Sequence, residues 1–163
     1  MNNPYTFVRQ RGLYFDELDT TVIYEHSPGR TVTDSDNTFF SSMTMNPASI
    51  HLDAHASNQN EFGQRLVNSM FTLSTLVGLS VSQMTQSTTV ANLGFNEINF
   101  PAPVFAGDTL YASTRVVDKR LSKSRSGAGI VRFEHTARNQ DGAIVAIATR
   151  AALIVVAPER NAK

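Results

Sequence analysis

The chain has 163 residues, enough for one domain with a sizeable hydrophobic core. Its 14 basic and 14 acidic side chains cancel, which argues against nucleic acid or an anionic membrane as the main partner, because both are usually bound through a basic excess. Cysteine is absent, so disulfides, thiolate metal sites and cysteine nucleophiles are excluded. The start of the chain, from Met1 to Tyr5, has no charged segment followed by an apolar run, so we expect no secretory signal and a cytoplasmic protein.

The sequence predicts a single domain over residues 1–163, with its core at about 13–157 and frayed ends. Residues 13–18 are expected to cover part of this core. β-Branched residues over 20–24 predict a strand, and Ser27-Pro28-Gly29 is typical of a turn. Thr33 or Ser35 is expected to cap a short helix that runs to Met43, and three apolar side chains should share one face of it: Phe39, Phe40 and Met43.

Residues 61–84 are apolar nearly all round a helix, which is typical of a membrane span or of a helix wrapped by its own protein. Polar residues interrupt the stretch, and no apolar run approaches the ~18 residues that a span needs. We therefore expect a buried helix.

After this helix the apolar pattern changes to a period of two. Leu93, Phe95 and Glu97 share one face, while Ile98 and Phe100 change phase and predict a bulge or bend. Further strands are expected over 110–118, 129–138 and 143–156, and Asn139-Gln140-Asp141-Gly142 predicts a hairpin turn between the last two.

Both faces of the last strand look covered. One face carries Val145, Ile147, Thr149, Ala151, Leu153 and Val155, and the other carries Ala146, Ala148, Ala152, Ile154 and Val156. Long antiparallel strands after one wholly apolar helix predict an α+β architecture in which a curved sheet wraps around that helix.

The order of these segments resembles a known family. A short helix, a loop that contains Asn46, Pro47 and His51, a buried helix, and residues 100–110 (FPAPVFAGDTL) are similar to the MaoC-like hot-dog enzymes, which are R-specific enoyl-CoA hydratases and related dehydratases. The likeness runs from about Phe15 to Val156. Residues 26–37 (HSPGRTVTDSDN) look like the branch that holds mesaconyl-CoA and itaconyl-CoA hydratases.

Hydration of an unsaturated thioester needs a base that activates water, an acid that protonates the α-carbon, and donors for the charge on the thioester oxygen. The resemblance implies that the family's His is His51 and that Asn46 stands where the family has Asp. An amide accepts no proton at neutral pH, but it can orient a water. Three alternatives follow: His51 cycles alone while Asn46 places the water, a carboxylate such as Asp53 substitutes, or catalysis has been lost.

The family's oxyanion donor is a backbone N–H at the start of the buried helix, and the matching dipeptide is Asn68-Ser69. A helix N-terminus leaves N–H groups unpaired and aligned with the helix dipole, so the resemblance makes Ser69 the donor. Otherwise Asn68 and Ser69 cap or pack the helix start.

The resemblance places Asn92, Gly94 and Gly107 where the pantetheine arm binds, although both glycines also fit a bulge or a turn. Arg30, or else Arg132, is the candidate receptor for a second carboxylate on the acyl group. Lys119, Arg120, Lys123 and Arg125 form a basic cluster that can meet CoA phosphates or be an ordinary charged loop.

No metal site is expected, because His51 and His55 have no third ligand at useful spacing. His26 and His135 are interpreted as structural, in a turn and a strand. No cofactor is implied, since coenzyme A is part of the substrate.

The resulting hypothesis is a hydro-lyase that hydrates an enoyl-CoA or dehydrates a 3-hydroxyacyl-CoA, with a short or branched dicarboxylic acyl group such as mesaconyl or itaconyl. We expect a homodimer or a higher homo-oligomer. The alternatives are a hot-dog thioesterase that uses Glu61 or Asp53, and a non-catalytic acyl-CoA-binding subunit.

Overall fold

The computed structural model describes residues 5–158, so the expectations for Met1–Pro4 and for the chain beyond Pro158 lie outside the described residues. A 3-10 helix, η1 (Phe15–Glu17), comes first. The remaining elements are β1 (Ile23–Thr31), α1 (Asp34–Met43), α2 (Ser49–Leu52), α3 (Ala54–Ser57), α4 (Ser69–Met84), β2 (Thr89–Asn99), β3 (Thr109–Leu121), β4 (Ala128–Arg138) and β5 (Ile144–Val155).

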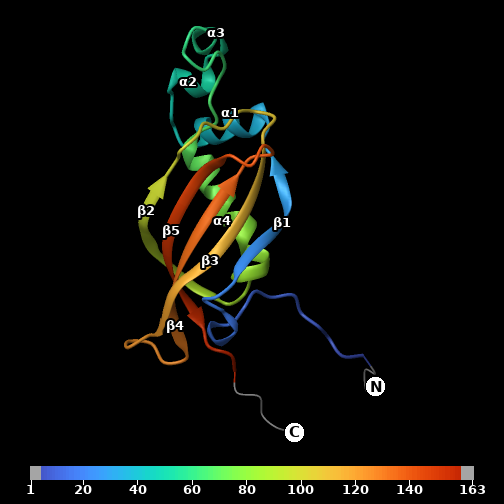
Figure 1. The fold of residues 1–163 in the computed structure, drawn as a ribbon, viewed down its shortest axis with the longest axis vertical. Helices are drawn as coiled ribbons and strands as arrows, with labels where there is room; N and C mark the ends of the chain where they lie inside the picture. Colours follow the sequence, from blue (N-terminus) through green and yellow to red (C-terminus); the bar gives the residue numbers. More distant parts are fainter. Residues whose placement is uncertain (1–4, 159–163) are drawn as a thin grey trace.

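The five strands form one antiparallel sheet in the order β1-β3-β4-β5-β2, and the sheet curves around α4 (Figure 1). This confirms the predicted α+β architecture of a curved sheet around one long helix. The strands β1 and β2 are the two edges. Helices α1, α2 and α3 lie together at the end of the molecule away from the two termini (Figure 1).

The predicted turn at Ser27-Pro28-Gly29 is wrong, because β1 continues through it. The pairing with β3 shifts register between His26 and Arg30, so the three residues form an irregularity inside the strand, with a cis Ser27–Pro28 bond. His26 therefore lies in a strand and not in a turn. A Cβ at Gly29 would come within 2.6 Å of the Tyr111 ring, which explains the glycine. The strand expected from Thr20 begins only at Ile23.

Helix α1 begins where the sequence predicts, but a different face is buried. The Thr33 side chain accepts a hydrogen bond from the Asp36 N–H and caps the helix. Phe39 and Met43 are 69% and 61% exposed, so the apolar face on which they lie is not the buried face of the helix. The fully buried positions are polar, Asn37 and Ser41, because α1 packs on a loop whose backbone groups need partners.

Helix α4 starts at Ser69, eight residues later than the apolar stretch predicts. Asn68 caps it by accepting a hydrogen bond from the Met70 N–H, and residues 61–68 form the loop that leads in. The helix is not wrapped all round, since Met70 is 46% exposed and Gly78 is also exposed. One five-stranded sheet covers one face of a helix, and the residues fully buried on that face are Thr72, Leu73, Leu76, Ser80 and Met84.

The strand predictions for the C-terminal half are confirmed. The Asn139–Gly142 segment forms the β4–β5 hairpin, with the Asn139 N–H donating to the Ala143 carbonyl and Gly142 at φ +80°. The predicted irregularity in β2 is present, but it lies earlier than Ile98, at register shifts after Thr89, Asn92 and Phe95.

Residues 13–18 cover the lower end of the core as expected. Phe15 and Leu18 are buried, and the Lys119 ammonium donates to both of their carbonyls, at 2.9 and 2.6 Å. The expected fraying of residues 1–12 does not extend to Gly12, whose N–H donates to the Gln86 carbonyl and whose Cα lies against the backbone of Met84 and Thr85.

The inner face of the sheet carries two apolar clusters, one near the start of α4 around Leu76 and Val104, and one near its end around Met84 and Phe133. A buried row of polar side chains crosses the sheet between them: His26 on β1, Thr114 on β3, His135 on β4 and Arg150 on β5.

The donors and acceptors of this row have one consistent direction. Arginine only donates, so Arg150 Nε–H donates to His135 Nε2 (2.8 Å) and His135 Nδ1–H donates to Thr114 Oγ1 (2.7 Å). The Thr114 hydroxyl then donates to His26 Nε2 (2.7 Å), and His26 Nδ1–H donates to Gln83 Oε1 (2.7 Å). The Arg150 contact requires a neutral His135, and in this arrangement of donors His26 is neutral as well.

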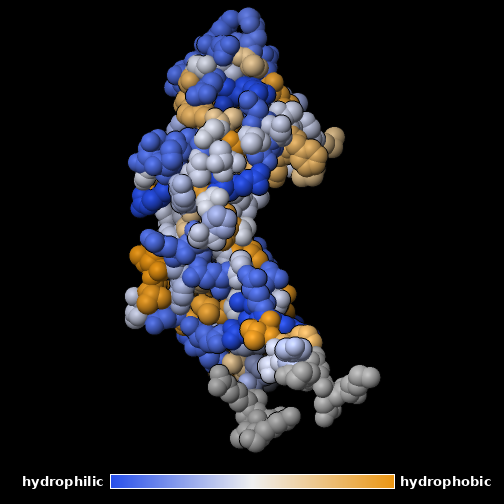
Figure 2. All heavy atoms as spheres, turned by 90° about the vertical axis from the view of Figure 1, so that its right-hand side faces the viewer, coloured by the Kyte–Doolittle hydropathy of each residue, from blue (hydrophilic) through white to orange (hydrophobic). Residues whose placement is uncertain are grey.

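On the face that Figure 2 shows, apolar atoms occur in separate small groups, and the end that carries α2 and α3 is mostly hydrophilic. Within residues 5–158, no helix combines the length and the apolar character needed to cross a membrane.

Candidate active site

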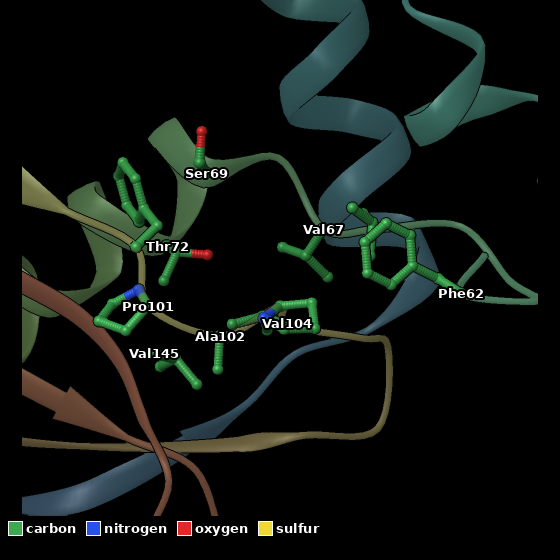
Figure 3. A pocket seen from close by; sticks show the side chains of 11 residues that line it. Phe62, Val67, Ser69, Thr72, Pro101, Ala102, Val104 and Val145 are labelled. Carbon is green, nitrogen blue, oxygen red and sulfur yellow. The ribbon is translucent and has the colours of Figure 1, made fainter. Parts of the chain in front are cut away.

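A cavity of about 420 Å³ opens at the start of α4 (Figure 3). Its volume is in the range of small-molecule sites. The walls are the first turn of α4, the loop before it, and the segment between β2 and β3. The lining residues are Phe62, Leu66, Val67, Ser69, Thr72, Phe100, Pro101, Ala102, Pro103, Val104 and Val145. The cavity is thus apolar, with polar groups at the helix start.

Residues 66–69 form the wall that connects the cavity to the rest of this end of the molecule. The Leu66 N–H donates to the Ile50 carbonyl, and the Val67 N–H donates to the Val104 carbonyl at 2.9 Å. The Asn68 N–H donates to the Asn37 side chain, also at 2.9 Å. Each successive peptide is therefore fixed to a different element, which holds the helix start in place.

His51 lies on α2, half-buried, and is attached to this wall. One ring nitrogen, Nδ1, lies 2.9 Å from the Leu66 carbonyl oxygen. A carbonyl only accepts, so Nδ1 carries the proton and the neutral ring has its lone pair on Nε2. That is the form in which an imidazole can accept a proton from water.

Asn46 lies in the turn after α1 and is partly buried. Its side-chain oxygen accepts a hydrogen bond from the Ala48 N–H at 3.1 Å. The backbone N–H of Asn46 donates to the Ser41 carbonyl at 2.9 Å. Asn46 thus shapes the loop that leads to His51. The side-chain Nδ2 group has no protein partner within residues 5–158 and is the part of the amide left to hold a water.

Ser69 is the first residue of α4 and lines the cavity, with Thr72 one turn further on (Figure 3). The N–H of a first helical residue has no partner within the helix, and here the Asn68 side chain caps Met70 instead. The Ser69 N–H therefore remains a donor at the positive end of the α4 dipole.

Arg30 does not reach this cavity. Its guanidinium lies 2.6 Å from the Asp36 carboxylate, and Asp36 also accepts hydrogen bonds from the Thr33 backbone and hydroxyl. Although partial burial opposes the charge, the hydrogen bonds from Thr33 and Arg30 lower the pKa of Asp36. Arg132, the other candidate, pairs with Asp118 on the neighbouring strand β3. No cation is among the residues that line the cavity.

The predicted pantetheine residues do not line the cavity either. Asn92 and Gly94 lie exposed on β2, at one of its register shifts, and Gly94 has a φ of +136°. Gly107 is in the turn before β3, with a φ of +99° and its N–H donating to the Val32 carbonyl. Open space surrounds the Cα of both glycines, so they have room for a ligand, but their backbone angles alone also explain them.

The remaining candidates have structural partners or lie apart. Asp53 separates α2 from α3 and caps α3 through the Ala56 N–H, so His51 and His55 belong to different short helices. Glu61 is exposed in the following loop. Within residues 5–158, no three metal-ligating side chains come together.

Sequence reasoning missed Asn37 and Arg150. Asn37 is 2% exposed, and its side chain contacts both the His51 segment and the wall at residues 66–68. Arg150 is 4% exposed on a face of β5 that otherwise carries alanines and Ile154. The period-two alternation along β5 places Arg150 on the same face as the buried alanines, so the sequence pattern could have identified it. No sequence pattern distinguishes Asn37 from the other polar residues of α1.

The MaoC like domain family matches residues 20–139, which is most of the chain. The chain belongs to the MaoC-like domain family. This confirms the resemblance to the MaoC-like dehydratases and R-hydratases.

Among individual MaoC-like relatives, a mesaconyl-CoA hydratase from Haloarcula marismortui is 26% identical over 133 residues, covering 82% of this chain and 37% of the relative. The chain thus spans about a third of the length of the curated relatives that it matches.

Solved structures confirm the fold. A monoamine oxidase regulatory protein from Archaeoglobus fulgidus superposes with a TM-score of 0.81 at 30% identity, covering 93% of this chain and 100% of the other. A double hot-dog protein from Mycobacterium tuberculosis superposes with a TM-score of 0.82 at 22% identity, covering 96% of this chain and 48% of the other. The architecture is therefore the hot-dog fold.

Proposed function

We propose that this MaoC-like chain catalyses the reversible hydration of an enoyl-CoA thioester, with the half-buried His51 as the acid and base. The observation that carries the proposal is the hydrogen bond from His51 Nδ1–H to the carbonyl of Leu66, which leaves Nε2 as the basic atom. Leu66 lines the cavity, whereas His51 lies outside the lining and is attached to the cavity wall through this bond. A held tautomer with one open nitrogen is what proton transfer at this site needs.

In the hydration direction, His51 Nε2 takes a proton from water while the oxygen adds to the β-carbon. The same proton, now on Nε2, can then protonate the α-carbon, so that one water is added across the double bond. Asn46 holds the attacking water through its Nδ2 group, and the Ser69 N–H binds the thioester oxygen as it gains charge. Neither role requires a carboxylate at position 46.

The acyl group of the proposed substrate is short or branched and dicarboxylic, and the first thioesters to test are mesaconyl-CoA and itaconyl-CoA. The similarity to a mesaconyl-CoA hydratase supports this choice. Among residues 5–158, no cationic side chain lines the cavity, so in a dicarboxylic complex a cation that pairs with the second carboxylate has to come from outside the lining. It is supplied either by Arg30, once released from Asp36, or by a second copy of the chain. Asn92, Gly94 and Gly107 are proposed to contact the pantetheine arm.

We also propose a homodimer formed at a sheet edge. Within residues 5–158, the 11-residue strand β2 pairs with β5 alone, so its other side presents unpaired backbone groups. Such an edge is usually covered by another strand. Light scattering coupled to size exclusion measures the mass directly, and a monomer at working concentrations would contradict this proposal.

The experiment that tests the function is incubation with crotonyl-, hexenoyl-, mesaconyl- and itaconyl-CoA, with mass spectrometry for water addition and for free CoA. Addition of water supports the hydratase, and restriction to the dicarboxylic thioesters supports the substrate proposal. Release of free CoA would contradict the hydratase proposal and indicate a thioesterase. Binding of the thioesters without any turnover would replace the hydratase proposal with a non-catalytic acyl-CoA-binding subunit.

A further inference from the structure

We propose that Asn37 of α1 is a positioning residue for the active site, because its buried side-chain amide joins the segment that carries His51 to the wall that carries the Ser69 N–H. This inference rests on the proposed hydratase function for its kinetic consequence, while its geometric part is testable without activity.

Every hydrogen-bonding direction of this amide but one is used. Asn37 Nδ2 donates to the Leu66 carbonyl at 2.9 Å and to the His51 carbonyl at 3.2 Å. Its Oδ1 accepts the Asn68 N–H at 2.9 Å. One side chain therefore contacts both the proposed base and the residue before the proposed oxyanion donor.

The Leu66 carbonyl binds both the His51 ring and the Asn37 side chain. This oxygen accepts His51 Nδ1–H and Asn37 Nδ2–H, each at 2.9 Å, so both of its lone pairs are occupied. The carbonyl selects the His51 tautomer, and Asn37 fixes the carbonyl. Without the amide, the Leu66–Val67 peptide is held only at its N–H, by the Val104 carbonyl, and its carbonyl has one donor fewer to orient it. The imidazole then has a less firmly oriented partner for Nδ1–H, and the Nε2–H form becomes accessible.

The chemistry of the three partners explains why asparagine stands here. Two backbone carbonyls require two donors and one N–H requires an acceptor, all within reach of a short side chain. Aspartate supplies acceptors only, and leucine of similar size supplies none. Burial strengthens this requirement, since a buried backbone group left unpaired is costly.

The test uses Asn37→Asp, which preserves size and the acceptor for the Asn68 N–H while it removes both donors, together with Asn37→Ala. Ser41→Ala is the matched control: Ser41 is buried one turn further along α1 and its hydroxyl accepts a hydrogen bond from the Asn68 side chain at 3.3 Å, but within the described residues it forms no hydrogen bond with Leu66 or His51. The ¹⁵N shifts of the His51 ring, assigned by comparison with His51→Gln, report the tautomer independently of turnover.

In the wild-type chain we expect the Nδ1–H tautomer, and in both Asn37 variants a mixture with the Nε2–H form. On a thioester that the wild type hydrates, kcat should fall by about 100-fold with a much smaller change in KM, as a misplaced catalytic group predicts. Ser41→Ala should retain the tautomer and a kcat within about twofold of wild type.

A His51 ring that stays Nδ1–H in Asn37→Asp, with kcat unchanged, would overturn the positioning role. If the wild type hydrates none of the thioesters, the proposed function fails, and the tautomer alone still decides the role of Asn37. Should neither variant fold, an Nε2–H ring in the folded wild type would overturn the proposal, and an Nδ1–H ring would support it.

Discussion

The start of α4 and the middle of the sheet each hold histidine in a different way. His51, at the start of α4, gives one nitrogen to a backbone carbonyl and leaves the other open. His135, in the middle of the sheet, is 0% exposed and has both nitrogens engaged, one by Arg150 and one by Thr114. The difference separates a histidine with one ring nitrogen left open, the proposed acid and base, from a histidine whose ring is part of the core.

The same contrast extends to charge. Burial, with the nearby Arg150 and His26, lowers the pKa of His135 to about 3, so this ring is neutral at pH 7. Burial also lowers the pKa of His26, although the hydrogen bond to Gln83 opposes the shift. Arg150 itself has no carboxylate partner, and its Nη2 atom is buried without a hydrogen bond within the described residues.

Among the substitutions that test this comparison, replacement of His51 should have the largest effect, and the effect should be on activity. His51→Ala should lower kcat for hydration by about 100- to 10,000-fold, because it removes the proposed acid and base. Its thermal unfolding should change little, since the ring is only half-buried and makes one backbone hydrogen bond. Full activity in a folded His51→Ala variant would contradict the assignment.

The converse substitution should act on stability. His135→Ala leaves Arg150 Nε–H and the Thr114 hydroxyl without their partner inside the core, so we expect a loss of about 3 kcal/mol in the free energy of unfolding, measured with urea. If the variant folds, its KM should match the wild type. A stability equal to the wild type would show that the polar row is not a structural element.

As the pH falls, the free energy of unfolding should first decrease because of the two histidines of the polar row, and the carboxylates should contribute only at lower pH. The unfolded chain protonates both histidines near pH 6.5, whereas folding holds their pKa values lower. Stability from this source is therefore complete above pH 6.5 and is lost as the pH falls toward 3, by about 1.4 kcal/mol per pH unit for each fully neutral histidine.

Carboxylates with lowered pKa values, Asp19, Asp36 and Glu134, add a loss only near and below their ordinary pKa. Urea titrations between pH 7 and 5 therefore isolate the histidines. A stability that stays constant over this range would contradict the neutral state of the row.

The smallest expected effect is that of Asn46→Asp. The carboxylate keeps the acceptor for the Ala48 N–H, so the loop should retain its shape, and it adds a second base beside the proposed water. We expect hydration of crotonyl-CoA to stay substantial or to rise, measured by steady-state kinetics. Complete inactivation of a folded variant would argue against matching Asn46 to the family's acidic position.

Several elements were predictable because local chemistry specifies them. Thr33 and Asp36 form a cap whatever surrounds them, and the Asp-Gly pair at 141–142 makes its own hairpin turn. The boundary of α4 was not predictable in this way. Leu66 and Val67 continue the apolar pattern, yet their N–H groups pair with Ile50 and Val104, which are distant in the sequence.

Burial of polar groups was the other point that sequence patterns did not determine. Phe39 and Met43 look like the core face of α1, but the buried positions are Asn37 and Ser41. A hydrophobic pattern shows which residues favour burial, whereas the need of a neighbouring backbone for hydrogen bonds appears only once that backbone is in place.

The sequence by itself determined the order of helix and strands and the antiparallel hairpins, because period, caps and turn residues act locally, and its motifs already resembled the MaoC-like family. Only the tertiary structure decided that Leu66 selects the tautomer of His51, that Asn37 joins the two, and that Arg150 lies inside the sheet beside His135. These contacts join residues 15 to 29 positions apart, and their strength depends on burial that no local pattern records.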